Sequence, residues 1–520
     1  MPMRKKKSSA NTSPSKLNLE YRTYRGVRQY VTAANVQSRV SDNDLEISGN
    51  KYAVFSKTLP HNEYGEVANT DWNMMLTALT TMQQSDFNAI PAAANTVRGL
   101  VSPQSSFSYS LAGQDPQCYN LINAPSIASE EAAGEMMEVY EMALHRDISF
   151  DTIKAGSDSN TTRALATLNS YGDDFKGPKI GTTVTSNTIF RGTCPGELVG
   201  PYVSQLLMLP YDFGNCPVTQ TFREESDQVS STEVAGWLRI QNGQAPEANA
   251  EPNMTGNINY LYRPRDLASM VHNDPPSGIF FGAAQVLLDC GVTFDKNALA
   301  AMGPREEPFT SFAEGDFYSV IGTVTKLALL AAWHQKWCVN MKLRPEVMAG
   351  RIHFQDTGDR AYGIDPSNKG SNTIAAIKSN NSSGTALLPL VYPEGSPNHP
   401  AYPAGHAVIS GACITVIKAF IDTEGAWPIQ AKHSTNGSTL VNYTAADASE
   451  MTIEGEINKV ASNVALGRNM AGVHYRSDGD MGILLGEQVA IAYLRDLKDS
   501  YNENFDGWVL QKLDGSMEII

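Results

Sequence analysis

Apolar residues recur at helical spacing through the second half of the chain. In residues 314–334, steps of three and four place on one face Phe317, Val320, Ile321, Val324 and Leu327. The same spacing recurs in residues 405–420, 454–469 and 481–497. Shorter apolar helices are predicted within residues 265–274 and 280–292. Several amphipathic helices of this length with short connections predict a helix-bundle architecture.

The first half of the chain shows a different pattern. One clear helix is predicted over residues 129–147, where Ser129 precedes an acidic first turn. Residues 150–260 are rich in Gly, Thr, Asn and Pro, with short strand-like pieces such as residues 182–190. We therefore predict a mainly α fold with few short strands. Its parts are a disordered basic and polar tail (1–18), a loop-rich region for packing and oligomer contacts (19–262) and a helical bundle (263–520).

Composition narrows the function classes. The chain has 520 residues, 42% of them hydrophobic, and no apolar run of about 18 residues that would span a membrane. Its net charge of −15 disfavours nucleic-acid binding. Residues 1–18 lack the apolar segment of a secretory signal. We expect a soluble protein, cytoplasmic by default, whose compartment the sequence leaves unknown.

The six cysteines have no metal-binding spacing. Cys290 and Cys413 lie in apolar helical patterns and are interpreted as buried core thiols. Cys118, Cys194 and Cys216 lie in loop-like segments where disulfides are an open alternative.

Three clusters of basic residues lie at the ends of the predicted C-terminal helices. The first holds Lys336 and Arg344, the second Gly405 and His406 behind Pro403, and the third Arg468, His474 and Asp478. Taken singly, each fits a solvated helix end or an ordinary proline-led helix start. Together they supply three cations, backbone N–H donors and two imidazoles, which is what a buried tetrahedral oxyanion needs.

The order and spacing of these clusters resemble the superfamily of vanadium-dependent haloperoxidases, type-2 phosphatidic acid phosphatases and class A acid phosphatases. The strings QKWCVNMKLRPE, EGSPNHPAYPAGHAVISGACITVIKAF and VALGRNMAGVHYRSD look specifically like red-algal and cyanobacterial vanadium bromoperoxidases. The seven residues between Lys336 and Arg344 match the algal subgroup. The similarity covers roughly residues 50–520 and predicts a helical-bundle catalytic region at 263–520.

The resemblance implies that vanadate is the cofactor, with His474 as the protein ligand of vanadium and further contacts to its oxygens. These contacts would come from Lys336, Arg344, Ala404, Gly405, His406 and Arg468. His406 would act as the acid–base residue, oriented by Asp274, while Lys336 polarises the peroxide. His399 matches the second histidine of bromoperoxidases. The implied partners are hydrogen peroxide, a halide (most readily bromide) and a small organic acceptor, and by analogy a large homo-oligomer such as a dodecamer.

Two features depart from the family pattern. Ala404 stands where the family usually has Ser, so one hydrogen bond to the anion is missing. The segment that corresponds to the red-algal calcium loop, MGPREEP before FTSFAEGD, is shortened, so calcium binding stays open.

The sequence also leaves two other functions open. An acid phosphatase would use the same pocket, with His474 as nucleophile and His406 as leaving-group acid. A non-enzymatic oxyanion-binding or shell-forming protein would keep the fold, and Ala404 favours that alternative. The native organic substrate and the order of halide preference are not readable from the sequence.

Overall fold

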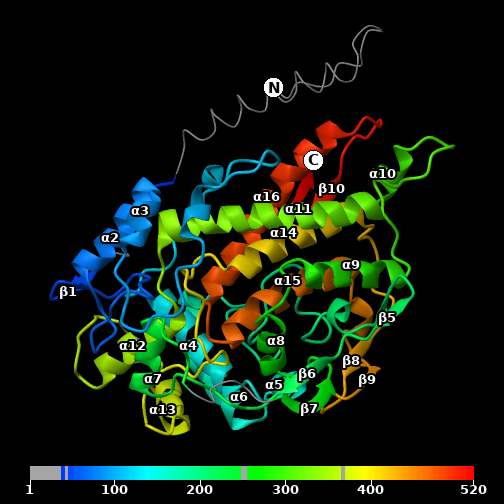
Figure 1. Cartoon of the computed structure of the whole chain (residues 1–520). Coiled ribbons are helices and arrows are strands. Elements are labelled where there is room, and N and C mark those ends of the chain that lie inside the picture. The colour runs from blue at the N-terminus through cyan, green and yellow to red at the C-terminus, as the bar shows by residue number, and fades with distance from the viewer. Residues whose placement is uncertain (1–36, 41–44, 248–253, 365–368) are drawn as a thin grey trace.

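Four long helices form the centre of the fold (Figure 1). They are α11 (Glu314–His334), α14 (Gly405–Phe420), α15 (Ile453–Met470) and α16 (Arg476–Ser500). Each lies where the apolar spacing predicts a helix, and α14 contacts the other three. The mainly helical fold class is therefore confirmed.

The structure is a computed structural model that describes residues 37–40, 45–247, 254–364 and 369–520. The tail predicted at residues 1–18 lies outside these ranges. Within them, no helix is both long enough and apolar enough to cross a membrane.

Helix α14 lies so close to α16 that their backbones touch. Of the residues of α14, all but His406 are buried. A Cβ on Gly411 would overlap the carbonyl oxygen of Ile483, and one on Gly486 would overlap that of Val408. Small residues are therefore required on both helices for this approach, which fixes the start of α14 relative to the start of α16.

The remaining helices surround this centre. Helix α8 (Pro264–Met270) packs on α15, and α9 (Gly278–Asp289) contacts α14 and α11. Helix α4 (Glu130–Leu144), predicted from its Ser129 cap, contacts α15, α12 and α13. The other α-helices are α2 (Asn69–Thr81), α3 (Gln84–Asn88), α5 (Phe150–Ala155), α6 (Ser159–Ser170), α7 (Val234–Gln241), α10 (Lys296–Ala300), α12 (Pro345–Asp356) and α13 (Ser371–Asn380).

Short helical turns connect several of these elements. The 3₁₀ turns are η2 (Pro103–Phe107), η3 (Pro116–Cys118), η4 (Gly172–Asp174), η5 (Gln205–Leu207) and η7 (Ala448–Glu450), and the π turn η6 (Gln335–Asn340) continues α11.

The strands are short and antiparallel. One sheet joins β1 (Glu46–Ile47), β2 (Asn50–Lys51) and β3 (Val67–Ala68). The pairs are β4 (Tyr211–Phe213) with β5 (Cys216–Val218), β6 (Phe222–Glu225) with β7 (Met254–Asn259), β8 (Ala431–His433) with β9 (Leu440–Asn442) and β10 (Val509–Gln511) with β11 (Met517–Ile519). The strand-like character predicted for residues 182–190 is wrong. Only an isolated bridge between Ile180 and Thr183 forms there, since strand propensity alone does not provide a pairing partner.

One hydrophobic core runs from the N-terminal region into the bundle. Ala53, Met137 and Leu168 belong to the same buried cluster as Ile417 and Leu494. The boundary at residue 262 stays a prediction, since this core extends on both sides of it. All six cysteines are free, so the disulfide alternative is not realised. Cys413 is buried as predicted, whereas Cys290 at the end of α9 is partly exposed.

We expect Gly486→Ala to destabilise the fold by at least about 1–3 kcal/mol, because the new methyl group would overlap the backbone of α14. Gly479→Ala on the same helix is the matched control. Its Cβ would meet Ala465 at an ordinary 3.5 Å, so we expect no loss and a gain of up to about 1 kcal/mol from helix propensity. Urea unfolding of both variants measures the difference, and equal stabilities would contradict the close contact between α14 and α16.

Candidate active site

The three basic clusters of the sequence meet where α11, α12, α14, α15 and α16 begin or end. Lys336 lies in the π turn η6, and Arg344 is the N-cap of α12. His399 lies in the loop before α14, whose N-cap is Ala404. Arg468 lies in the last turn of α15, and His474 lies just before α16. Arg344 and His474, which are 130 positions apart in the sequence, thereby come within hydrogen-bond distance.

Arg344 lies between the two deepest histidines. Its Nη1 is 2.9 Å from His474 Nε2, and its Nη2 is 3.0 Å from His399 Nδ1. It also donates to the carbonyl oxygens of Val473 at 2.7 Å and His399 at 2.9 Å. Because a guanidinium only donates, both imidazole nitrogens must accept. Burial, reinforced by nearby cations, lowers the pKa of both histidines well below the usual value, so both rings are neutral.

The opposite nitrogen of His474 fixes its tautomer. Nδ1 lies 2.8 Å from Asp478 Oδ2, which also accepts the N–H of Tyr475 at 3.1 Å. Since the carboxylate accepts, the proton of His474 is on Nδ1 and the lone pair is on Nε2. The nitrogen that faces the cations is therefore the one able to bind a metal, and its partner nitrogen is fixed by a carboxylate, as is usual for metal-binding histidines.

Lys336 and Arg468 add two further buried cations. Lys336 Nζ donates to the carbonyl oxygens of Pro400 and Ala401, each at 2.7 Å. Burial lowers the pKa of Lys336 well below its usual value, and repulsion by Arg344 and Arg468 lowers it further. Burial likewise lowers the pKa of Arg344 to about 9. Cations buried close together repel one another, and an anion among them would relieve that repulsion.

Among the described residues, Arg468 is held by Tyr392 and Val271. Its guanidinium lies 5.2 Å from the centre of the Tyr392 ring, and its Nη1 donates to Val271 O and to Tyr392 Oη. Its Nε is buried and has no hydrogen-bond partner among the described residues. A buried guanidinium N–H is costly to leave unpaired, so this donor fits an oxyanion ligand.

His406 is the most accessible imidazole of the site, with 27% of its side chain exposed. Its Nε2 lies 2.8 Å from Asp274 Oδ1, so Nε2 carries the proton and Nδ1 is free to accept one. Burial and the charge of Arg468 lower the pKa of His406 more than the Asp274 carboxylate raises it. A neutral imidazole with a free nitrogen is suited to general base chemistry.

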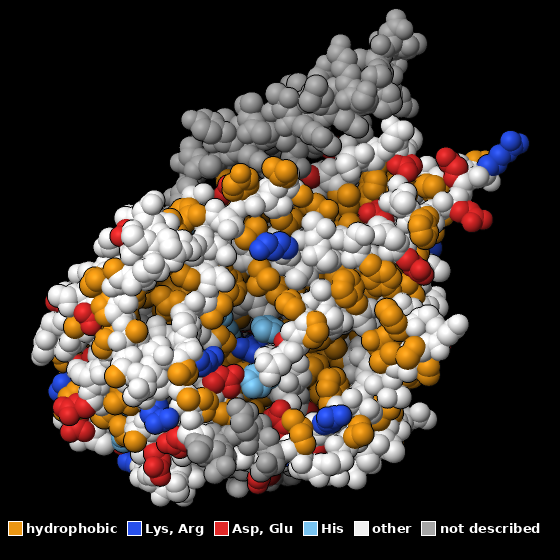
Figure 2. Space-filling model, in the orientation of Figure 1, with side chains coloured by type: hydrophobic (Ala, Val, Ile, Leu, Met, Phe, Trp, Pro, Cys, Tyr) orange, Lys and Arg blue, Asp and Glu red, His pale blue; other side chains and the backbone are white. Residues whose placement is uncertain are grey.

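The first turn of α14 completes the site. Ala404 is the N-cap and makes no side-chain hydrogen bond, and Gly405 begins the helix. Backbone N–H groups at such a start are unpaired within the helix and lie at the positive end of its dipole. A Cβ on Gly405 would lie 3.3 Å from the Trp333 ring, so glycine fits tightly here. Figure 2 shows histidine side chains gathered in a central hollow of the face in view, with basic and acidic side chains beside them.

Two aromatic residues of the site are not among those predicted from the sequence. The Trp333 ring lies 4.8 Å from the His399 ring, between that histidine and Gly405. Tyr392 supports Arg468 and also stacks against His272, with ring centres 3.7 Å apart. Trp333 precedes Lys336 by about one helical turn, and this spacing could have placed it in the site. Tyr392 carries no comparable signal, because its contacts are to residues distant in sequence.

The donor set fits vanadate. The described residues contain no group of three or more His, Cys, Asp and Glu side chains that could hold a metal ion. They do provide one imidazole lone pair on His474, three buried cations, an unpaired N–H on Arg468 and the start of α14. Such a set suits a metal that arrives as a tetrahedral oxyanion and takes a single protein ligand.

Comparisons with known proteins identify the family of the chain. Residues 317–503 match the family model described as the VCPO second helical-bundle domain. The vanadium-dependent bromoperoxidase of Ascophyllum nodosum is 31% identical over 85% of this chain and 82% of its own length. The enzyme of the same name from Corallina pilulifera is 30% identical over 89% and 90%. The chain belongs to the vanadium-dependent bromoperoxidase family. The family membership that the sequence motifs predicted, that of a vanadium-dependent haloperoxidase, is confirmed.

A solved structure extends the likeness to nearly the whole fold. The homohexameric second vanadate-dependent bromoperoxidase from Ascophyllum nodosum superposes with a TM-score of 0.88 at 26% identity, covering 98% of this chain and 91% of that one. The loop-rich N-terminal region is thus part of the shared family fold.

We expect Ala404→Ser to tighten the binding of a tetrahedral oxyanion by about tenfold, because a hydrogen bond to a charged group is worth about 1.5–3 kcal/mol. Titration of phosphate and of vanadate into anion-free wild type and variant measures this. Alternatively, the new hydroxyl caps α14 instead of contacting the anion. The free energy of unfolding would then rise by about 1 kcal/mol, and the affinities for phosphate and for vanadate would stay unchanged. That result would contradict the placement of residue 404 against the anion.

Proposed function

We propose that this chain binds vanadate and uses hydrogen peroxide to oxidise a halide, bromide most readily, to a hypohalous-acid-type halogenating species. The observation that carries the proposal is the neutral His474, whose Nε2 lone pair lies beside Arg344 within a buried group of three cations. The names of the relatives support vanadium and bromide as cofactor and substrate. A small organic molecule would accept the halogen.

The proposed roles follow from the contacts of each residue. His474 would bond vanadium through Nε2 once Arg344 Nη1, which donates to that nitrogen, turns its hydrogen bond to a vanadate oxygen. Lys336 and Arg468 would bind the vanadate oxygens beside it. The N–H of Gly405 would add a donor at the start of α14, where Ala404 contributes its backbone. When bound, vanadate would supply Lewis acidity that activates peroxide without a change of oxidation state.

Side chains of the protein would carry out the proton transfer. His406 Nδ1, free because Nε2 is hydrogen-bonded to Asp274, would accept a proton from hydrogen peroxide and return it to the hydroxide-level oxygen that then leaves as water. Lys336, a fixed donor in the site, would hydrogen-bond the peroxide oxygen that the halide attacks. His399 and Trp333, whose rings contact each other, would line the side from which the halide approaches.

Assembly and calcium are part of the same proposal. The structural neighbour is described as a homohexamer, which supports a homo-oligomer for this chain, and a dodecamer stays the larger alternative. Calcium binding by the shortened segment at residues 302–308 stays an open possibility, and the proposed reaction does not need it.

Removal and return of vanadate tests the function directly. Protein treated with chelator and acidic phosphate should lose bromide-dependent halogenation and regain it with orthovanadate, and phosphate should compete with the return. A parallel assay with p-nitrophenyl phosphate tests the phosphatase alternative. Full halogenation by protein shown to contain no vanadium would refute the proposal, and turnover of the phosphate ester without halogenation would favour the phosphatase.

Two single substitutions separate binding from proton transfer. His474→Ala should abolish both bound vanadium and halogenation, because it removes the metal ligand. His406→Ala should keep a measurable share of the vanadium and lose about 10²–10⁴-fold in rate, because it removes acid–base assistance. Vanadium content by elemental analysis and circular dichroism of both variants are measured beside turnover. Equal vanadium retention by the two variants would contradict these roles.

A further inference from the structure

We propose that Lys342 and Glu135 form a positioning pair for His474, acting through Asp478. Lys342 lies inside the stretch between Lys336 and Arg344, and the roles assigned above leave it unused. Its side chain is buried, with 4% exposed, as is that of Glu135, with 5% exposed. The inference rests on the proposed function, since it concerns the vanadium ligand.

Asp478 is the residue through which the pair would act. This carboxylate is fully buried, and its Oδ2 accepts from His474 Nδ1 and from the N–H of Tyr475. Its other oxygen, Oδ1, has no hydrogen-bond partner among the described residues. The Lys342 ammonium lies 3.7 Å from Oδ1. A buried carboxylate oxygen without a donor is unfavourable unless a charge compensates it, so Lys342 keeps Asp478 oriented toward His474.

Lys342 is itself held in place from three sides. Its Nζ donates to Glu135 Oε1 at 2.7 Å and to Ser477 Oγ at 3.1 Å. It also lies 4.1 Å from the centre of the Tyr475 ring, within range of a cation–π interaction. A lysine has a long, flexible side chain, and these contacts confine its ammonium to one position beside Asp478.

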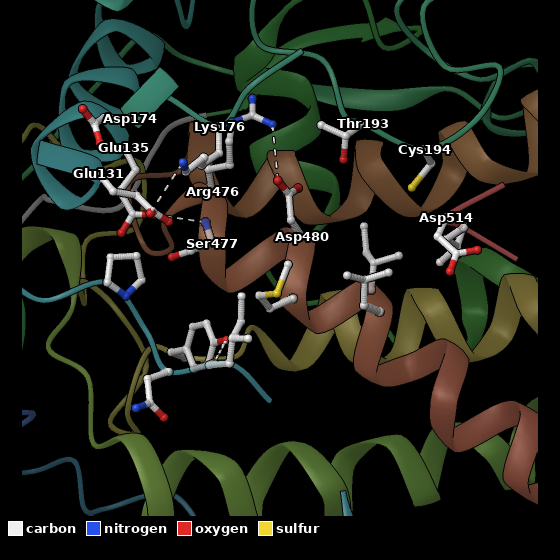
Figure 3. A pocket seen from close by; sticks show the side chains of 18 residues that line it. Glu131, Glu135, Asp174, Lys176, Thr193, Cys194, Arg476, Ser477, Asp480 and Asp514 are labelled. Atoms are coloured by element: carbon white, nitrogen blue, oxygen red, sulfur yellow. Dashed lines mark hydrogen bonds and ion pairs between the residues drawn. The ribbon is translucent and has the colours of Figure 1, made fainter. Parts of the chain in front are cut away.

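Glu135 links the pair to the start of α16. Its second oxygen accepts the N–H of Ser477 at 3.0 Å, a backbone donor in the first turn of that helix. Figure 3 shows Glu135 and Ser477 joined in this way at the edge of a cavity of about 450 Å³, which is also lined by Glu131, Arg476 and Asp480. Glu135 comes from α4, so a residue of the N-terminal region fixes the helix turn that carries Asp478.

The pair supports Asp478 without changing the charge of the site. A lone lysine would add a fourth cation to Lys336, Arg344 and Arg468, whereas Lys342 with Glu135 is neutral overall. The expected effect is therefore on the orientation of His474 and not on the general attraction of anions. Vanadate and phosphate distinguish the two, because vanadium forms a bond to the imidazole and phosphate interacts only through charge and hydrogen bonds.

The test is the double variant Lys342→Met/Glu135→Gln, which keeps the net charge of the protein. Equilibrium dialysis of anion-free protein gives separate dissociation constants for vanadate and for phosphate. We expect the vanadate constant to rise by about tenfold, the lower end of the range for partners of metal ligands. The phosphate constant should change by less than about twofold, since its contacts are mainly electrostatic.

Lys459→Met/Glu456→Gln is the matched control. That pair lies within α15, is equally buried at 2% exposed each and has an Nζ–Oε1 distance of 2.6 Å. It should lower stability and leave both anion affinities unchanged. If the first double variant does not fold, Glu135→Asp replaces it, because the shorter side chain pulls Lys342 away from Asp478. This milder change should raise the vanadate constant by about threefold.

The outcomes separate this inference from the proposed function. An unchanged vanadate constant, or equal weakening of vanadate and phosphate, would overturn the positioning role. Wild-type protein that binds no vanadate would instead refute the proposed function.

Discussion

The burial of three cations around one neutral histidine is the constraint on which the site depends. Lys336, Arg344 and Arg468 repel one another, and burial makes this repulsion strong. Such an arrangement is stable only while the surrounding fold holds it, through carbonyl oxygens, an aromatic ring and the carboxylate of Asp478. The charge that the fold must hold together is the same charge that would attract an oxyanion.

The close packing of α14 against α16 is a second constraint on the site. The close approach of α14 and α16, made possible by Gly411 and Gly486, sets the start of α14 against the start of α16. One helix start offers N–H groups at Gly405, and the other follows His474 and carries Asp478. The packing of the two helices therefore sets where the N–H groups of Gly405 lie relative to the proposed metal ligand His474.

The N-terminal region packs against the bundle and also contacts the helix start beside the candidate site. Its helix α4 shares the hydrophobic core with the bundle and brings Glu135 to the first turn of α16. The 0.88 TM-score over almost the whole chain agrees with a fold that extends well beyond the matched helical-bundle domain. Division of the chain at residue 262 therefore describes a change in composition, while the hydrophobic core extends across it.

The sequence by itself determined the helices and the residue types of the site. Apolar spacing located α11, α14, α15 and α16, since a buried helix face leaves a local, periodic trace. The motifs also supplied the cations and imidazoles, because the chemistry of a side chain is a property of the residue. The strand predicted at 182–190 does not form, because a strand needs a pairing partner and the local sequence does not specify one.

Only the tertiary structure decided which atom of each residue is available. The lone pair of His474 is on Nε2 because Asp478 occupies Nδ1, and His406 is free at Nδ1 because Asp274 occupies Nε2. The supporting contacts of Tyr392, Trp333, Lys342 and Glu135 join residues far apart in the chain. Such protonation states and orientations depend on what lies opposite each group in space, and periodicity or spacing along one chain carries no record of that.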